Sequence, residues 1–309
     1  MKVLFVAGDP KPERWTAPIK ALLPEAEVYV WNPEGPVIDA DYAIVWQPPA
    51  ELFERERKLK AIFNLGAGID GLLAVPNLPA GLTIVRLEDA GMSVQMAEYV
   101  LHQLLEASRE MEVYREQQRN GIWKIHRPIK RADWPVGVMG LGQIGKKVAR
   151  TLADLDYRVY GWARSEHTLE HITTFAGRKS LREFLKQTRV LVNTLPLTDE
   201  TRNIIDYDAL ADLQPGAVVI NVGRGEHLVD DDLLKALDDG LVARASLDVF
   251  RNEPLPSDHP FWTRREITIT PHISARTLRD ATLEQITGKI RDHARGQPIT
   301  GIVDTSRGY

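Results

Sequence analysis

Three side chains in the second half of the sequence are suited to act on a small carboxylic acid: those of Arg224, Glu253 and His272. Each follows an apolar run that is typical of a β-strand. A guanidinium can hold a carboxylate through two hydrogen bonds and polarise an adjacent carbonyl. An imidazole can give that carbonyl oxygen a proton, and a nearby carboxylate can orient the imidazole and favour its charged form. Taken singly, each residue also has an ordinary structural explanation, and spacing alone does not decide.

A glycine-rich turn, Gly140-Leu141-Gly142-Gln143-Ile144-Gly145, comes between the apolar run Val136–Met139 and a helical pattern. In that context the first glycine permits the tight turn, the second lets the backbone approach a pyrophosphate, and the third allows close helix-to-strand packing. The turn also fits a phosphate-loop pattern, but Lys147 stands where an NTPase needs Ser or Thr. We therefore predict a dinucleotide site, with a turn that binds nothing as the alternative.

The next predicted strand ends in Trp162-Ala163-Arg164-Ser165, where NAD enzymes commonly place an acidic residue for the ribose hydroxyls. Arg164 and Ser165 are better suited to a 2′-phosphate, through charge-assisted hydrogen bonds. The sequence thus favours NADP over NAD, although NAD stays possible and Arg164 has the alternative of an ordinary surface arginine.

A second glycine turn, Gly66-Ala67-Gly68, follows the apolar run Ala61–Leu65. Backbone N–H groups in such a turn can bind an anion, and a substrate carboxylate fits. The alternative is a turn that merely needs positive φ. Trp46 ends another apolar run, and we expect its indole either to wall a small substrate pocket or simply to pack.

The segment His167-Thr168-Leu169-Glu170-His171 matches the H-x-x-E-H pattern of zinc hydrolases. It follows the proposed cofactor loop directly, without an obvious third ligand, so we predict no metal site and two solvent-facing histidines. The sequence also lacks the G-x-S-x-G nucleophile elbow, which speaks against an α/β-hydrolase.

Composition narrows the remaining classes. A length of 309 residues favours about two domains. The formal net charge of -4 offers no field for a polyanion, so nucleic acid is not an expected partner. The absence of cysteine fits a reducing compartment, and no apolar stretch reads as a signal peptide or a membrane span. We expect a cytoplasmic protein that does not bind membranes.

Short β-rich runs alternate with helical patterns in both halves of the chain, which predicts α/β architecture with parallel sheets. One long helix is expected over residues 93–118, with Ser93 as N-cap and Gly121 just beyond its end, and a last helix over 275–295. The expected strands are Val3–Ala7, Val28–Trp31, Tyr42–Trp46, Ala61–Leu65, Thr83–Leu87, Val136–Met139, Arg158–Trp162, Val190–Leu195, Ala217–Val222, Ala243–Phe250 and Ile267–Thr270.

The chain resembles the D-isomer-specific 2-hydroxyacid dehydrogenase family over nearly its whole length. The likeness is carried by the Gly140–Gly145 turn and by Asn221-Val222-Gly223-Arg224-Gly225, Asp248-Val249-Phe250-Arg251-Asn252-Glu253-Pro254 and Thr270-Pro271-His272-Ile273-Ser274. Other segments are similar to the branch that reduces glyoxylate and hydroxypyruvate: Leu65-Gly66-Ala67-Gly68-Ile69-Asp70, Leu87-Glu88-Asp89-Ala90-Gly91-Met92, Gln95-Met96-Ala97-Glu98-Tyr99 and Arg307-Gly308-Tyr309.

This resemblance implies that Arg224, Glu253 and His272 are the catalytic residues. It also implies that Asp248 lies near the nicotinamide amide, that Leu195-Pro196 runs along the cofactor, and that the Gly66–Gly68 loop meets the substrate carboxylate. The implied fold has two Rossmann-like parallel-sheet domains with a cleft between them: a flavodoxin-like substrate domain (1–98 plus 275–309) and a dinucleotide-binding domain (99–274). A homodimer that contacts through the nucleotide domain is implied as well.

The implied reaction is NADPH-dependent reduction of small 2-oxo acids, glyoxylate to glycolate and hydroxypyruvate to D-glycerate. Ala163-Arg164-Ser165 departs from the NAD-using members, because it lacks their acid. A corepressor branch of the same fold binds the dinucleotide as a regulatory ligand, so a dinucleotide-sensing interaction protein is the alternative.

Overall fold

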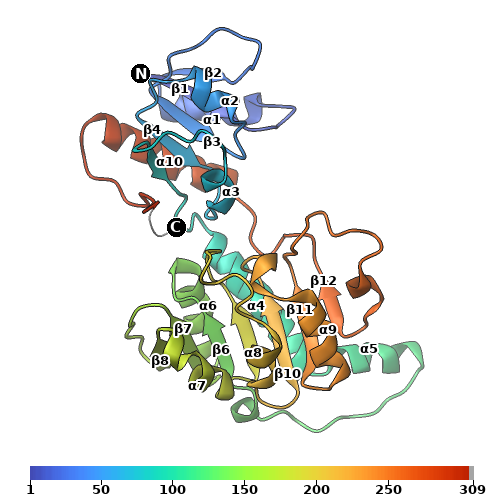
Figure 1. Ribbon diagram of the computed structural model, residues 1–309. Helices are drawn as coiled ribbons and strands as arrows, with labels where there is room; N and C mark the ends of the chain where they lie inside the picture. The colour runs from blue at the N-terminus through green and yellow to red at the C-terminus, as the bar shows by residue number, and fades with distance from the viewer. Residues whose placement is uncertain (306–309) are drawn as a thin grey trace. The chain divides into compact units, whose positions relative to one another are not determined.

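The computed structural model describes residues 1–305 and divides the chain into two compact units. The first unit comprises Met1–Gly91 and Thr277–Tyr309, and the second comprises Met92–Arg276 (Figure 1). The segment Arg307-Gly308-Tyr309, one of those that carry the resemblance, lies outside the described residues. None of the helices within residues 1–305 is long and apolar enough to cross a bilayer.

The first unit is built on five parallel strands in the order β2-β1-β3-β4-β5. The strands are β1 (Lys2–Val6), β2 (Glu27–Val30), β3 (Tyr42–Val45), β4 (Ala61–Asn64) and β5 (Thr83–Val85), and the helices are α1 (Glu13–Leu22), α2 (Glu51–Arg55), α3 (Asp70–Leu73) and α10 (Arg279–Ala294). Strands β3 and β4 are buried at every residue, as expected where helices cover both faces of a parallel sheet. Leu52 of α2 and Leu72 of α3 pack with Leu4 and Val45 on one face. On the other face, Phe5 stacks on Trp15 of α1.

The second unit contains seven parallel strands in the order β12-β11-β10-β9-β6-β7-β8. Its strands are β6 (Val136–Met139), β7 (Val159–Ala163), β8 (Ile172–Ala176), β9 (Val190–Asn193), β10 (Ala217–Asn221), β11 (Val242–Leu247) and β12 (Ile267–Ile269). Its helices are α4 (Met92–Ser108), α5 (Met111–Arg119), α6 (Gln143–Ala153), α7 (Leu181–Lys186), α8 (Tyr207–Ala211) and α9 (Asp230–Asp238), with short 3-10 helices at Arg131–Asp133, Arg178–Ser180, Gly225–His227 and Pro260–Thr263. These two all-parallel sheets with flanking helices confirm the predicted α/β fold class.

Two apolar cores lie on opposite faces of this seven-stranded sheet. On one face Val100 and Leu104 of α4 pack with Val148 of α6. On the other face Phe184 of α7 and Leu233 of α9 belong to one buried cluster. The sheet order reverses where β6 pairs with β9, and loops at such a reversal form the usual ligand crevice of an α/β sheet. The glycine turn follows β6, so the fold presents that turn at the reversal.

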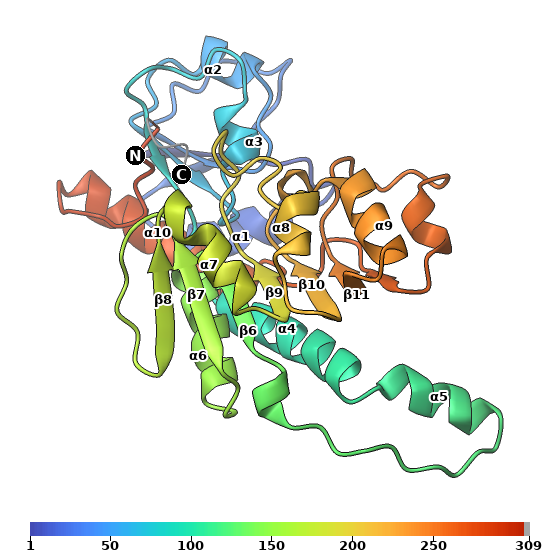
Figure 2. The ribbon, with the colours of Figure 1, turned by 60° about the horizontal axis from the view of Figure 1, so that its bottom comes forward.

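The single long helix predicted over residues 93–118 is wrong. The structure has α4 ending at Ser108 and α5 beginning at Met111, with the intervening Glu110 in the left-handed region at φ 53°. Neither glycine nor proline occurs at this break, so the sequence carries no warning of it. Figure 2 shows α5 extending beyond the end of α4, away from the sheet, and none of the residues of α5 is buried.

Candidate active site

His272 and Glu253 form a direct pair on the two loops that follow β12 and β11. Nδ1 of His272 donates a hydrogen bond to Oε2 of Glu253 over 2.8 Å. The side chains are 47% and 37% exposed, so the imidazole is accessible while it is held by the carboxylate. With Nδ1 committed to Glu253, the other ring nitrogen, Nε2, is the one that can exchange a proton with a reactant.

The backbone of His272 is strained. Its φ is 54°, in the left-handed region that residues other than glycine rarely adopt, and such strain persists where the surroundings over-determine it. The completely buried Asp248 supplies those surroundings: its backbone oxygen accepts from His272 N (2.9 Å), and its carboxylate accepts from Ile273 N and Ser274 N, both at 2.8 Å. Asp248 therefore fixes the loop that carries His272, whereas its contact with the nicotinamide amide stays a prediction.

A tyrosine on α4 completes this arrangement. Thr270 Oγ1 donates to Asp248 Oδ1 over 2.6 Å, and the hydroxyl of Tyr99 lies 2.7 Å from Thr270 Oγ1. Burial raises the pKa of Tyr99 to about 12, so its hydroxyl stays protonated. Because the Thr270 hydrogen is used toward Asp248, Tyr99 donates and the chain of hydrogen bonds runs toward the buried carboxylate.

The charges around His272 favour its protonated form. The hydrogen bond to Glu253 raises the pKa of His272 above 6.5; burial opposes this shift, and the charge of Arg224 also lowers the pKa. Burial raises the pKa of Glu253, but hydrogen bonds from His272 and from Phe250 N outweigh it, so the net shift is downward. Both shifts favour an imidazolium held by a carboxylate, the form in which His272 can act as a general acid.

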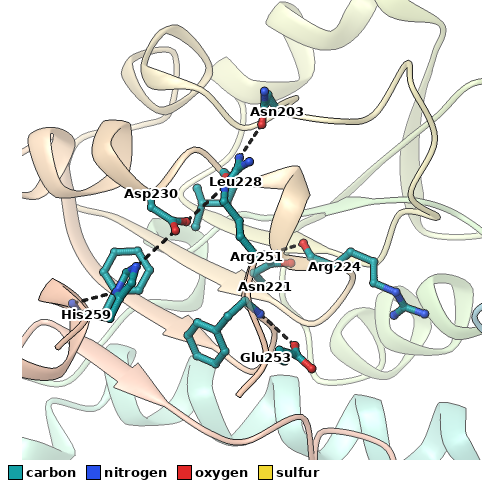
Figure 3. A network of polar contacts seen from close by, with 10 residues as sticks. Asn203, Asn221, Arg224, Leu228, Asp230, Arg251, Glu253 and His259 are labelled. Atoms are coloured by element: carbon teal, nitrogen blue, oxygen red, sulfur yellow. Dashed lines mark hydrogen bonds and ion pairs between the residues drawn. The ribbon is translucent and has the colours of Figure 1, made fainter. Parts of the chain in front are cut away.

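Arg224 leaves the end of β10 in an extended conformation. The buried side chain of Asn221 donates from Nδ2 to the backbone oxygen of Arg224 over 3.0 Å, and Figure 3 shows the guanidinium directed away from that contact. The guanidinium donates to Gly223 O over 2.8 Å. Its charge acts on the pKa of both Glu253 and His272, so the three predicted catalytic side chains lie in one electrostatic neighbourhood.

Arg251 ties the loop of Arg224 to the loop of Glu253. It donates to the backbone oxygen of Leu228 and lies 3.7 Å from the carboxylate of Asp230, which His259 approaches from the other side at 3.5 Å (Figure 3). The two loops are also in backbone contact, because a Cβ on Gly225 would lie 1.9 Å from the carbonyl carbon of Phe250. Burial raises the pKa of Asp230, and the cations beside it oppose that shift.

The Gly140–Gly145 turn has the geometry that a bound pyrophosphate needs. Gly140 has φ 96°, and a Cβ on Gly145 would lie 1.8 Å from Gly140 O, so neither position accepts a side chain. A Cβ on Gly142 would meet no described atom within 4 Å. Gly142 is the N-cap of α6 and has no side chain with which to cap that helix, so the capping of its first-turn N–H groups is left to a ligand or to water. This cradle fits a dinucleotide.

The other predicted cofactor residues lie on the loops after β7 and β9, the two strands that pair with β6, and at the start of α6. Arg164 and Ser165 follow the end of β7 and are exposed, as a 2′-phosphate site requires. Leu195 is buried, whereas Pro196 is exposed and its backbone oxygen accepts from Thr201 Oγ1 over 2.8 Å. Gln143 and Ile144 begin α6 beside the glycines.

The predicted substrate residues of the first unit are also brought together. A Cβ on Gly66 would lie 2.5 Å from the indole of Trp46, so this glycine is needed because the ring packs on it. The φ of Gly66 lies outside the left-handed region, which removes positive φ as its explanation. The buried Asn64 side chain donates to the backbone oxygens of Gly66 and Gly68 at 3.0 and 2.8 Å. Trp46 is 44% exposed, so it packs and remains accessible.

The H-x-x-E-H segment forms a turn before β8. His171 is exposed and lies 3.4 Å from Glu170, but His167 is partly buried, so the expectation of two solvent-facing histidines is wrong for one of them. The backbone oxygen of His167 accepts from Thr174 Oγ1 of β8, a strand that was not predicted from the sequence. This hydrogen bond holds His167 against the strand. Within residues 1–305, no group of three or more His, Asp or Glu side chains could hold a metal ion.

Comparison with known proteins gives these residues a family. Residues 101–274 match the model of the D-isomer specific 2-hydroxyacid dehydrogenase NAD binding domain. The chain belongs to the D-isomer specific 2-hydroxyacid dehydrogenase family. Glyoxylate/hydroxypyruvate reductase A of Serratia proteamaculans (strain 568) is 42% identical, and that of Yersinia enterocolitica (serotype O:8) is 40% identical, each over 100% of both chains. The predicted family is therefore confirmed.

Solved structures agree over the whole chain. A D-isomer specific 2-hydroxyacid dehydrogenase from Xanthobacter autotrophicus Py2, in complex with NADPH and MES, has a TM-score of 0.94 and 36% identity, over 100% of this chain and 99% of that one. An NADPH-dependent glyoxylate/hydroxypyruvate reductase from Sinorhizobium meliloti, in complex with NADP and sulfate, has a TM-score of 0.92 and 34% identity, with the same coverage. The chain therefore has the fold of the solved members of this dehydrogenase family.

Sequence reasoning missed several polar residues of the site. Asn64 and His227 were not singled out, and Tyr99 was named only within the segment Gln95–Tyr99 without a role, yet each is hydrogen-bonded to a loop that carries predicted site residues. The signal was present for Asn64, which is a polar residue at the carboxyl end of an apolar strand. Tyr99 lies within a helix and His227 within a loop, so their partners could be identified only from the fold.

Proposed function

We propose that this chain is an NADPH-dependent reductase of small 2-oxo acids, which converts glyoxylate to glycolate and hydroxypyruvate to D-glycerate. The observation that carries the proposal is the His272–Glu253 pair beside Arg224, on loops of the same sheet as the glycine turn. The names of the relatives from Serratia and Yersinia support this substrate class, because each covers the full chain.

The cofactor residues in this proposal are those of the second unit. Backbone N–H groups at Gly140–Gly145 would hold the pyrophosphate, Leu195 and Pro196 would flank the cofactor, and Asp248 would lie near the nicotinamide amide. Arg164 and Ser165 would hold a 2′-phosphate, which supports NADPH over NADH. The Xanthobacter and Sinorhizobium structures, which contain NADPH and NADP, support the same choice. When bound, the reduced nicotinamide supplies the hydride.

The protein's own part in the reaction is to hold the acid and deliver a proton. Arg224 binds the substrate carboxylate and polarises the neighbouring carbonyl. His272 gives the proton on its Nε2 to the carbonyl oxygen as that oxygen gains negative charge. Glu253 keeps Nδ1 of the ring as a donor and stabilises the imidazolium before transfer, while Asp248 keeps the strained loop in place.

In this proposal residues 1–98 plus 275–309 form the substrate-binding domain and residues 99–274 form the nucleotide-binding domain. Asn64 holds the carbonyl groups of the Gly66-Ala67-Gly68 turn, which leaves the turn's N–H groups for the carboxylate. Trp46 would limit the pocket to small 2-oxo acids, since its indole packs on Gly66.

Assembly and location complete the proposal. We propose a cytoplasmic homodimer that contacts through the nucleotide-binding domain, with no nucleic acid or membrane as partner. Sedimentation of the purified protein tests the dimer, and fractionation of cells that produce the chain tests the location. A monomer at micromolar concentration, or recovery in a membrane or secreted fraction, would contradict these two parts without touching the reductase.

The decisive experiment is an assay of purified protein with glyoxylate or hydroxypyruvate, in which absorbance follows oxidation of NADPH and, separately, of NADH. Faster oxidation of NADPH is the expected result. Oxidation of NADH alone would keep the reductase and overturn the cofactor preference. Inactivity with both cofactors across a panel of 2-oxo acids, together with a partner protein whose binding responds to the dinucleotide, would favour the sensing protein instead.

A further inference from the structure

His227 lies between two loops that the proposed function assigns to different ligands. It is completely buried at the end of a 3-10 helix (Gly225–His227) that begins directly after Arg224. Its Nε2 lies 3.2 Å from the backbone oxygen of Pro196, on the loop after the neighbouring strand β9. The proposed mechanism uses neither ring nitrogen of this histidine.

The partners of the ring determine its tautomer. Nδ1 faces two donors, the backbone N–H of Arg224 at 3.1 Å and the side-chain amide of Asn193 at 2.8 Å. Nδ1 must therefore accept, and the ring hydrogen is on Nε2, which donates it to Pro196 O. An imidazolium here would place an N–H against two other donors, so the geometry requires the neutral ring.

Buried amides complete the network around Arg224. Asn193 uses its second amide hydrogen on Asn221 Oδ1 over 2.9 Å, and Asn221 in turn donates to Arg224 O. Both backbone polar groups of Arg224 are thus bound by buried side chains, and Figure 3 shows the Asn221 contact. A Cβ on Gly223 would lie 2.8 Å from Asn193 Nδ2 and 3.1 Å from His227 Nδ1, so the glycine leaves space for the network.

We propose that His227 is a positioning residue that fixes the position of Arg224 relative to the cofactor-side loop at Pro196. This inference rests on the proposed function, which assigns Arg224 to the substrate carboxylate and Pro196 to the cofactor. Nδ1 accepts a hydrogen bond from Arg224, which the proposal assigns to the substrate, and Nε2 donates one to Pro196, which the proposal assigns to the cofactor. A small displacement of a positioned group costs turnover or affinity, because binding groups must meet the substrate in a productive geometry.

The hydrogen bonds of the two ring nitrogens can be tested separately, because an asparagine can replace only Nδ1 and a glutamine can replace only Nε2. In His227→Asn the amide oxygen takes the place of Nδ1 and can accept from Arg224 N, but nothing reaches Pro196 O. In His227→Gln the amide nitrogen takes the place of Nε2 and can donate to Pro196 O, but the acceptor for Arg224 N is lost. His227→Leu removes both and is the reference for the loss of the whole ring.

The readouts are the KM for glyoxylate and the dissociation constant for NADPH, the latter from a fluorescence titration without substrate. His227→Gln is expected to raise the KM for glyoxylate roughly tenfold, the scale of one hydrogen bond at a binding group, with NADPH affinity nearly unchanged. His227→Asn is expected to weaken NADPH binding several-fold and to leave the KM for glyoxylate nearly unchanged. His227→Leu is expected to change both.

A role in packing alone predicts a different pattern, in which both amide variants lower stability and change the two constants in parallel. That pattern, or two unchanged constants in both variants, would overturn the inference. The ¹⁵N spectrum of the wild-type histidines tests the same geometry without any variant: a buried ring with its hydrogen on Nε2 supports it, and an Nδ1–H ring or an imidazolium overturns it. Failure of the proposed function is distinct, because the wild-type protein would then bind NADPH yet reduce no 2-oxo acid.

Discussion

The loops on the two sides of the order reversal in the seven-stranded sheet hold their functional groups in different ways. After β6 and β7, the cofactor region relies on backbone: Gly140 has positive φ, and Gly145 lies against Gly140 O. After β10, β11 and β12, the acid–base region relies on side chains that reach across loops, such as Glu253 to His272. The first region is determined by steric exclusion within six residues, and the second by hydrogen bonds between segments far apart in sequence.

The two regions are therefore sensitive to different kinds of substitution. A glycine turn fails when a side chain is added, and the loss appears in cofactor affinity. A hydrogen-bonded pair fails when a group is removed, and the loss appears in turnover or in its pH dependence. Variants of the two regions should therefore separate cleanly in their kinetic signatures, and a variant that mixes the signatures would break the comparison.

The largest effect is expected in the acid–base region, for His272→Ala. Loss of the proton donor should lower kcat for reduction by about 10²- to 10⁴-fold, the usual contribution of a positioned general acid. NADPH affinity, measured by fluorescence titration, should stay near the wild-type value. His171→Ala is the matched control, because that histidine is exposed before β8, and it should leave kcat unchanged. Wild-type turnover in His272→Ala would remove His272 from the mechanism.

The next effect belongs to the cofactor region and compares two glycines of one turn. Gly142→Ala adds a methyl group into open space, so the free energy of unfolding should hardly change while NADPH affinity falls roughly tenfold or more through the lost approach of the pyrophosphate. Gly145→Ala places a methyl group 1.8 Å from Gly140 O, so both stability and affinity should fall. Thermal unfolding and NADPH titration check the pair. Unchanged affinity in Gly142→Ala would mean that the cradle holds no pyrophosphate.

The same contrast explains how much could be predicted from the sequence. The glycine turn, both parallel sheets and the strands that bear Arg224, Glu253 and His272 are predictable, because apolar periodicity and glycine spacing are local properties. The break between α4 and α5 was not predictable, since Glu110 adopts positive φ without a glycine to mark it. Strand β8 was missed because Ile172–Ala176 contains two threonines, is buried only at Ile172 and lies at the sheet edge, so it lacks a continuous apolar run.

The contacts of the residues that support the site could not be predicted from the sequence for a related reason. Asp248 was expected near the nicotinamide, but its complete burial and its hydrogen bonds to the His272 loop follow from tertiary packing. Tyr99 reaches Thr270 across 171 positions of sequence, and no spacing rule connects them. The alternative that Gly66 serves a positive φ is wrong, because the structure shows instead that the Trp46 indole excludes a side chain there, and anion binding by this turn stays a prediction.

A smaller effect is expected in the cofactor region, for Arg164. Arg164→Ala should weaken NADPH binding roughly tenfold to hundredfold, the range for a lost charge-assisted hydrogen bond, and leave NADH binding unchanged. Arg158→Ala is the matched control, because this exposed arginine directly precedes β7, at the end of the strand opposite to Arg164, and should alter neither constant. Equal losses for NADPH and NADH in Arg164→Ala would show that the arginine does not read the 2′-phosphate.

The smallest change in maximal rate, with the most specific signature, is expected for Glu253→Gln. The carboxylate raises the pKa of His272 through its hydrogen bond and its charge, while burial and Arg224 lower it. Reduction needs protonated His272, so its rate falls as pH rises through that raised pKa. Without the carboxylate charge the pKa of His272 falls, so the decline in reduction rate should begin at lower pH. At a pH below the His272 pKa of both wild type and variant, the rate should stay within roughly tenfold of wild type, because the amide oxygen still accepts from Nδ1.

The reverse reaction, oxidation of the 2-hydroxy acid, needs the neutral ring, so the pH at which oxidation begins should also move to lower values. A pH profile of kcat/KM in both directions checks this, and an unmoved alkaline limb would separate Glu253 from the proton donor.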